Sequence, residues 1–160
     1  MATQPPLAHI HATAVAYSGA GCLILGKSGS GKSRLAAEMI QLGARLVADD
    51  QVILTVQSGM LMASAPKELA NVLELRGIGL IRLPDIVPRH VLHLAIELDP
   101  DAEDRLPEPQ TATIEGLSIP LLRLKPPPIT GAGSVMLAIK AVQEGRMLPP
   151  DWRPVAEKTA

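Results

Sequence analysis

The stretch CLILGKSGSGKSRLAAEMIQL, residues 22–42, contains a short apolar run, a loop of glycine and serine, and a segment with helical spacing. The apolar run, residues 22–25, lies between glycines, which favours a buried strand over a helix. Over residues 32–42 apolar side chains recur at helical spacing, and Gly43 follows as a C-terminal stop. The order of these three segments predicts a loop that leads from a strand into the N-terminus of a helix.

This loop matches the phosphate-binding pattern G-x-x-x-x-G-K-S/T without a mismatch. The residues concerned are Gly26, Lys27, Ser28, Gly29, Ser30, Gly31, Lys32 and Ser33. Glycines let backbone N–H groups approach phosphate oxygens and form an anion-binding nest at the start of a helix. In such loops the lysine contacts the β- and γ-phosphates and the final hydroxyl can bind Mg²⁺. We therefore predict that the chain binds a nucleotide, because a chance surface turn would not have a strand and a helix in register.

Two adjacent carboxylates, Asp49 and Asp50, follow a second predicted strand over residues 45–48. At the end of a strand in a parallel sheet, one carboxylate can hold Mg²⁺ and the other can accept a proton from an attacking hydroxyl. Two acids are also common in a solvated turn, so the residues alone leave both interpretations open. Which aspartate has which role also stays open, because neighbouring side chains at a strand end point to opposite faces.

Three further polar residues lie on segments that we predict to be extended. Glu74 and Arg76 are two residues apart, so on a strand they would share a face and suit a metal–phosphate site or a surface ion pair. From the residues alone we favour the ion pair. His11 lies in a predicted strand over residues 10–18, and a histidine on such an apolar strand is usually structural.

The rest of the chain predicts many short elements. We expect a hairpin over residues 52–56 and 60–63, strands at 91–98, 111–115 and 117–124, an acidic loop at 99–110, and helices at 66–72 and 135–144. The 13 glycines and 15 prolines in 160 residues agree with frequent turns. We therefore predict one α/β domain whose core is a mixed, β-rich sheet with a phosphate-binding loop.

Composition excludes several classes of function. The chain has no Phe, one Tyr and one Trp, its net charge is −1, and it has no basic tract, so we expect no binding to nucleic acid. The single cysteine, Cys22, cannot form an intrachain disulfide. The sequence has no basic segment at its N-terminus and no uninterrupted apolar run of about 20 residues. We therefore expect neither a secretory signal nor a membrane span. A cytoplasmic protein is the expectation.

Four segments in a fixed order resemble a known family. They are H-A-T-A-V from His11, the loop GKSGSGKS, G-A-R-L-V-A-D-D over residues 43–50, and L-E-L-R-G-I-G-L over residues 73–80. Together they resemble the catalytic domain of the bacterial HPr kinase/phosphorylase family, whose members phosphorylate a seryl residue of HPr, a phosphocarrier protein of the phosphotransferase system. The resemblance implies a fold similar to phosphoenolpyruvate carboxykinase. We expect the domain over residues 10–148, between a short leader (1–9) and a polar tail (149–160).

The resemblance also implies roles for single residues that bind the nucleotide and its metal. The loop over residues 26–33 would bind ATP, with Lys32 as a catalytic residue. Ser33 and Glu74 would be the Mg²⁺ ligands.

Further roles that the resemblance implies concern the transfer itself. Asp50 would deprotonate the attacking serine, and Asp49 would support it. Arg76 matches a signature arginine of the family and His11 an active-site histidine. Arg105, in E-D-R-L, matches an arginine that stabilises the transferred charge.

Two departures from the family pattern bear on activity. Only ten residues precede His11, so we expect the N-terminal domain of the longer members to be absent. The family's C-terminal loop reads like P-V-R-P-G-R-N and is tied to phosphorolysis, whereas residues 124–130 here read L-K-P-P-P-I-T, with neither arginine. We therefore expect a kinase with weak or no phosphorylase activity. The resemblance implies a homo-oligomer, which in the family is a hexamer.

Two other functions remain open on the sequence. One is a small-molecule kinase that uses the same loop, and the other is a nucleotide-binding sensor that transfers no phosphate. The joint presence of Lys32, Ser33, Asp49, Asp50 and Glu74 favours catalysis, because a sensor needs no proton acceptor.

Overall fold

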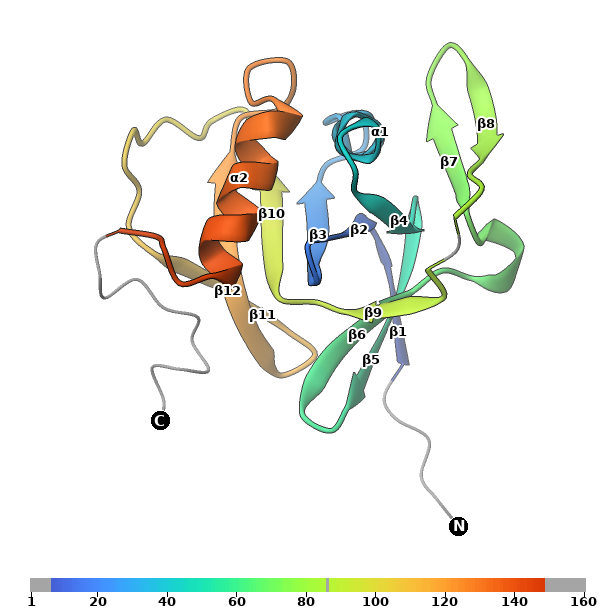
Figure 1. The fold of residues 1–160 in the computed structure, drawn as a ribbon, viewed down its shortest axis with the longest axis horizontal. Helices are drawn as coiled ribbons and strands as arrows, with labels where there is room; N and C mark the ends of the chain where they lie inside the picture. Colours follow the sequence, from blue (N-terminus) through green and yellow to red (C-terminus); the bar gives the residue numbers. More distant parts are fainter. Residues whose placement is uncertain (1–6, 86, 149–160) are drawn as a thin grey trace.

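The computed structural model describes residues 7–85 and 87–148 (Figure 1). Its elements in chain order are β1 (Leu7–His11), β2 (Thr13–Tyr17), β3 (Ala20–Gly26), α1 (Lys32–Gln41), β4 (Arg45–Ala48), β5 (Gln51–Gln57), β6 (Met60–Ser64), the 3₁₀ turn η1 (Lys67–Leu69), β7 (Val72–Leu75), β8 (Gly79–Arg82), β9 (Arg89–Val91), β10 (Leu94–Leu98), β11 (Gln110–Ile114), β12 (Leu117–Leu124) and α2 (Ala132–Gln143). Among these residues, neither helix is long and apolar enough to cross a lipid bilayer.

The centre of the fold is a six-stranded sheet with the order β11-β12-β10-β3-β2-β4. In it β10 is parallel to both β3 and β12, whereas β2 is antiparallel to β3 and to β4. The strands β3, β4, β10 and β12 therefore run in one direction and end at the same edge. Ligands of open α/β sheets bind at such carboxyl ends, so this edge is where the site is expected.

Two hydrophobic clusters cover the two faces of this sheet. On one face, α1 and α2 pack against Cys22 and Ile24 of β3. On the other, Leu23 packs against the four-stranded sheet β1-β5-β6-β9. Because successive side chains of a strand point to opposite faces, a central strand covered on both sides must be apolar throughout. This explains the continuous apolar run over residues 22–25.

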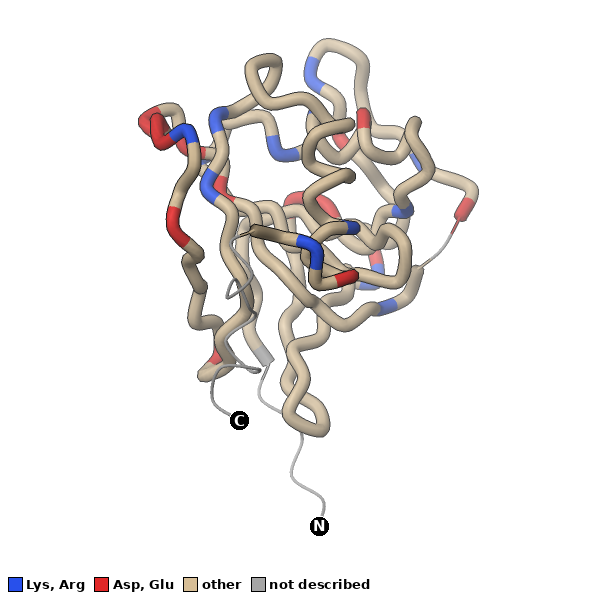
Figure 2. Tube along the Cα trace, turned by 60° about the vertical axis from the view of Figure 1, so that its left-hand side comes forward, with Lys and Arg blue, Asp and Glu red and all other residues tan. Residues whose placement is uncertain are grey.

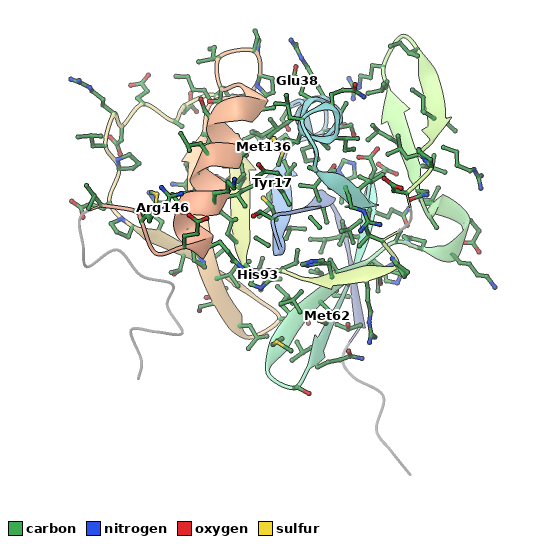
Figure 3. The ribbon with its side chains drawn as sticks, viewed as in Figure 1. Tyr17, Glu38, Met62, His93, Met136 and Arg146 are labelled. Atoms are coloured by element: carbon green, nitrogen blue, oxygen red, sulfur yellow. The ribbon has the colours of Figure 1, made fainter. Side chains whose placement is uncertain are left out.

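The core on the helix face is aliphatic with one aromatic at its margin. Met136 of α2 is buried and Tyr17 packs partly buried against the same cluster, and Figure 3 shows both between α2 and the sheet. The ammonium of Lys140 lies 5.9 Å from the centre of the Tyr17 ring, within the range of a cation–π contact. Burial raises the pKa of the Cys22 thiol, so that side chain behaves as a small core residue.

Two predicted strands are each divided between the two sheets. Residues 10–18 form the end of β1 and all of β2, and the chain changes sheet at Ala12, so the prediction of one strand was wrong. Likewise residues 91–98 divide into β9 and β10. The sequence pattern does not reveal such a corner, because the strands before and after it both place apolar side chains in a core.

The corner between β9 and β10 is fixed by a close approach to β3. His93 donates its backbone N–H to the carbonyl of Gly21 (2.8 Å) and accepts the Gly21 N–H at Nδ1 (2.9 Å). A Cβ on Gly21 would lie 1.9 Å from the carbonyl oxygen of Val91, so only glycine fits. Burial, together with the charge of nearby His90, lowers the pKa of His93, which keeps Nδ1 available as an acceptor.

The remaining predictions were confirmed or shifted locally. The hairpin β5–β6 forms as predicted, and its turn places Ser58 and Gly59 at positive φ (52° and 74°). The helix expected over residues 66–72 is only the short turn η1, and the following run folds back as the hairpin β7–β8. β1 begins at Leu7, so residues 7–9 belong to a sheet rather than to a leader. The expected tail, residues 149–160, lies outside the described residues.

Candidate nucleotide-binding and catalytic site

A cleft of about 1290 Å³ lies at the carboxyl edge of the six-stranded sheet. Its floor is the phosphate loop, by which we mean residues 26–33. One wall comes from His11, Asp50 and the hairpin β7–β8, and another comes from the end of β10 and from the segments that follow β10 and β12. The cleft therefore combines the phosphate loop with a wall of acidic and basic side chains and with a second wall of three prolines and three acidic residues.

The glycines of the phosphate loop are required by its backbone. Gly26, Gly29 and Gly31 have φ values of 155°, 82° and 99°, which other residues rarely adopt. A Cβ on Gly26 would lie 2.5 Å from Ser30 Oγ, and one on Gly31 would lie 3.2 Å from the Pro127 ring. Helix α1 begins directly after Gly31 and has no side-chain cap at this end. Its first N–H groups are therefore oriented for an anion, as the loop pattern predicts.

Lys32 lies inside the loop rather than on the surface. It is only 6% exposed, and its Nζ donates to the carbonyls of Gly26 (2.8 Å) and Lys27 (3.1 Å). An ammonium has three donors, so one remains for a phosphate oxygen. Burial lowers the pKa of Lys32, and the two aspartates at the end of β4 counteract this shift.

Asp49 is a buried carboxylate with three hydrogen bonds. It is 3% exposed, and its Oδ1 accepts the hydroxyls of Ser33 (2.7 Å) and Thr13 (2.9 Å). Its Oδ2 accepts the backbone N–H of Glu74 (3.0 Å). This carboxylate therefore ties the end of the phosphate loop to β2 and to β7.

Asp50 has the opposite environment. Its side chain is 51% exposed and lines the cleft, and its Oδ1 lies 2.9 Å from Nε2 of His11. Its φ of 68° places the residue in the left-handed region, which aspartate tolerates better than most residues. This turn sends the two neighbouring carboxylates in different directions, one into the protein and one into the cleft.

Glu74 and Arg76 both line the cleft, but not as neighbours on a strand. Glu74 belongs to β7, whereas Arg76 lies in the turn to β8. No ion pair joins them within the described residues, so the interpretation as a surface pair was wrong. The Arg76 guanidinium instead lies beside the phosphate loop, 3.5 Å from where a Cβ on Gly29 would be.

Arg105 is a predicted site residue that neither lines the cleft nor is hydrogen-bonded to a residue that does, whereas the buried Asp49 is joined to the cleft through Ser33 and Thr13. Arg105 is exposed in the loop over residues 99–109, where acidic positions gather (Figure 2). The role that the resemblance implies for it stays a prediction. Sequence reasoning missed Thr13, whose only signal was a hydroxyl within an otherwise apolar stretch, and missed the contact of Pro127 with the phosphate loop.

The oxygen donors at the loop fit a magnesium ion that is shared with a nucleotide. Among residues 7–85 and 87–148, no group of three or more His, Cys, Asp or Glu side chains could hold a metal by itself. Mg²⁺, however, is usually bound through one or two protein groups together with substrate phosphates and water. Ser33 and Glu74 offer such groups in the cleft, and the buried Asp49 carboxylate lies behind Ser33 and accepts its hydroxyl.

Comparison with known proteins agrees with this geometry. The family model for the HPr Serine kinase C-terminal domain matches residues 4–141. The HPr kinase/phosphorylase of Limosilactobacillus reuteri (strain DSM 20016) is 37% identical over 127 residues, which are 72% of this chain and 40% of that protein. That of Brevibacillus brevis is 46% identical over 79 residues, which are 49% of this chain and 25% of that protein. The chain thus spans less than half the length of these relatives.

A solved structure extends the comparison to the fold. The Hpr(Ser) kinase/phosphatase from Coxiella burnetii superposes with a TM-score of 0.78 at 26% identity, over 86% of this chain and 97% of that one. The predicted β-rich α/β fold around a phosphate loop is thereby confirmed. The family match covers both the phosphate loop and the two aspartates, and the chain therefore belongs to the HPr serine kinase C-terminal domain family.

Proposed function

We propose that this chain is an ATP-dependent protein serine kinase that phosphorylates a seryl residue of a small HPr-like phosphocarrier protein in the bacterial cytoplasm. The observation that carries the proposal is the pair of aspartates at the phosphate loop. Asp49 is buried and bonded to Ser33, as a group that organises a metal site should be. Asp50 is exposed in the cleft beside His11, as a proton acceptor for an incoming hydroxyl should be.

The binding part of the proposal uses the phosphate loop. Backbone N–H groups at the start of α1 and the Lys32 ammonium would hold the β- and γ-phosphates. Ser33 and Glu74 would hold Mg²⁺, with Asp49 behind Ser33 as the acceptor of its hydroxyl, and the ion would supply positive charge against the phosphate oxygens when it is bound. Arg76, beside Gly29, would add a cation on the cleft side of the loop.

The transfer part of the proposal uses Asp50. The seryl oxygen attacks the γ-phosphorus in line, a new O–P bond forms, and the bond from the γ-phosphorus to the β–γ bridging oxygen breaks. The proton of the seryl hydroxyl passes to the Asp50 carboxylate, and ADP leaves with the bridging oxygen. His11, with Nε2 2.9 Å from Asp50 Oδ1, holds this carboxylate at the cleft wall.

A protein substrate is favoured over a small molecule by the wall of the cleft. The hairpin β7–β8 extends away from the rest of the fold (Figure 1), and on it Ile78 is 76% exposed and Leu80 is 73% exposed. Ile78 also lines the cleft. Apolar side chains exposed beside a catalytic cleft suit a partner surface that covers them.

Replacing Ile78 by serine is expected to raise the KM for the carrier about tenfold, because burying such a side chain against a partner contributes about 1.5 kcal/mol or more. The KM for ATP and kcat at saturating carrier should stay within about twofold. Steady-state kinetics with varied carrier measure both. Leu42→Ser, which removes a 57% exposed leucine at the end of α1, is the matched control and should change neither constant. An unchanged KM for the carrier in Ile78→Ser would place the docking surface elsewhere.

Phosphorolysis is expected to be at least about a hundredfold slower than phosphorylation, because each missing charge-assisted hydrogen bond to inorganic phosphate costs about 1.5–3 kcal/mol. In residues 124–130 the cation is Lys125, and its Nζ donates to the Pro100 carbonyl at 2.8 Å. Pro126 and Pro127 form the cleft wall here. The measurement is the release of pyrophosphate from seryl-phosphorylated carrier at several phosphate concentrations. Release at a rate comparable to the forward reaction would contradict a kinase with weak phosphorylase activity.

The test of the proposed function is incubation with γ-labelled ATP and HPr-like carriers, followed by mass-spectrometric location of the label. A single phosphoserine on the carrier, absent when that serine of the carrier is replaced by alanine, is the expected result. Nucleotide binding without transfer to any carrier would support a sensor instead.

A further inference from the structure

We propose that Thr13 is a positioning residue, whose hydroxyl fixes the Asp49 carboxylate so that this carboxylate can orient Ser33 toward a magnesium–nucleotide complex. The inference rests on the proposed function. Thr13 is 1% exposed, and its Oγ1 donates to Asp49 Oδ1 at 2.9 Å. Its neighbours on β2, Ala14 and Val15, are fully buried and apolar, so the hydroxyl has a specific partner in an otherwise apolar place.

The backbone is built to bring Thr13 to Asp49. The antiparallel pair β2–β4 has an irregular register: Ala14 lies opposite Ala48, but Val15 lies opposite Leu46. Continuing the register of Ala14 places Thr13 opposite Asp49, whereas the register of Val15 would place it one residue earlier. The bulge thus aligns the hydroxyl with the carboxylate, and bulges beside active sites commonly aim a side chain in this way.

The hydrogen bonds of Asp49 show what Thr13 contributes. Both oxygens are used: Oδ1 accepts from Thr13 and Ser33, and Oδ2 accepts the N–H of Glu74. These donors come from β2, α1 and β7, so the carboxylate plane is held from three directions. Without the Thr13 hydroxyl, Oδ1 would keep only the hydroxyl of Ser33, which is itself the group that must be oriented. Thr13 is therefore the fixed donor and Ser33 the adjustable one.

A positioning role and a merely structural role predict different measurements. If Thr13 only stabilises the sheet, removing its hydroxyl lowers the stability of the fold and leaves the response to Mg²⁺ unchanged. If it positions Asp49, the variant loses part of the gain in nucleotide affinity that Mg²⁺ provides, while metal-free binding to the loop N–H groups and Lys32 is unaffected. The ratio of the two affinities separates the roles.

The experiment is calorimetric titration of the full chain with a non-hydrolysable ATP analogue, once with Mg²⁺ and once with EDTA. Thr13→Val, which keeps the β-branched shape, is expected to reduce the gain from Mg²⁺ about tenfold, the effect of losing one hydrogen bond to a charged group. Thr13→Ser should restore the gain to within about twofold of the wild type, since it restores the donor. Val15→Ala, which removes buried volume from the same strand but no hydrogen bond to Asp49, should lower the urea midpoint and leave the gain unchanged.

The possible outcomes test the positioning role of Thr13 and the proposed function separately. A Thr13→Val variant with the wild-type gain overturns the positioning role while the proposed function stands. A wild-type chain that binds the analogue neither with Mg²⁺ nor with EDTA overturns the proposed function. If Thr13→Val does not fold, Thr13→Cys, which keeps a weak donor, must show a gain below that of Thr13→Ser, and equality of the two again overturns the positioning role.

Discussion

Lys32→Ala is expected to lower kcat for phosphoryl transfer by about a thousandfold or more, which is the scale of a cation that acts on the transferred phosphoryl group. The structure supports this size of effect because Lys32 is nearly completely buried within the phosphate loop. Two backbone carbonyls hold its Nζ in place, so little reorganisation is needed when a phosphate arrives. Single-turnover transfer of labelled phosphate from ATP to the carrier measures the effect directly.

The control for Lys32→Ala is a lysine that is remote from the cleft. Lys67→Ala removes an exposed ammonium from the turn η1 and should leave kcat within about twofold, the scale of a surface charge. Urea unfolding of both variants shows whether the fold is intact. Transfer by Lys32→Ala at more than about a tenth of the wild-type rate would mean that the loop N–H groups, rather than the lysine, carry most of the stabilisation.

The parts of the site that could be predicted are those encoded by a short continuous segment. The strand, phosphate loop and helix over residues 22–42 follow from glycine spacing and apolar periodicity, and the two aspartates follow the next strand directly. Asp49 and Asp50 could be named, but not distinguished. Their different environments arise from a left-handed backbone at Asp50, and the sequence at that position, a second aspartate, is compatible with either direction.

The parts that could not be predicted depend on pairing between distant segments. Thr13 meets Asp49 only through a bulge between β2 and β4, and Glu74 meets Asp49 only because β7 packs beside α1. The same reason explains the two strands that change sheet, since a register between strands is a property of the assembled sheets and not of local periodicity. Arg76 was expected on a strand, but a run that contains glycine is compatible both with a continuous strand and with a tight turn. In the structure the chain turns between β7 and β8, and Arg76 lies in that turn.

Asp50→Asn is expected to lower kcat by about a hundred- to ten-thousandfold, the range for loss of a general base. Asparagine keeps the size of the side chain and also tolerates the left-handed backbone at this position, so the fold and the cleft should be unchanged. The Asp50 side chain is half exposed and lines the cleft, and its hydrogen bond goes to His11 rather than to the phosphate loop. Affinity for the magnesium–nucleotide complex should therefore stay within about twofold. Calorimetry with a non-hydrolysable ATP analogue and single-turnover transfer measure the two steps separately.

Asp49→Asn is the matched comparison, because it makes the same chemical change at the neighbouring carboxylate. With the amide nitrogen at the Oδ2 position, the Glu74 N–H loses its acceptor. With the nitrogen at the Oδ1 position, the hydroxyls of Ser33 and Thr13 must accept instead of donate, which turns a Ser33 lone pair toward the amide and away from a metal. This variant should therefore already lose the gain in nucleotide affinity from Mg²⁺, whereas Asp50→Asn should fail only in the transfer step. Normal turnover by Asp50→Asn together with impaired turnover by Asp49→Asn would exclude Asp50 as the base. The pair of variants thus tests the assignment that the opposite environments of these two carboxylates support.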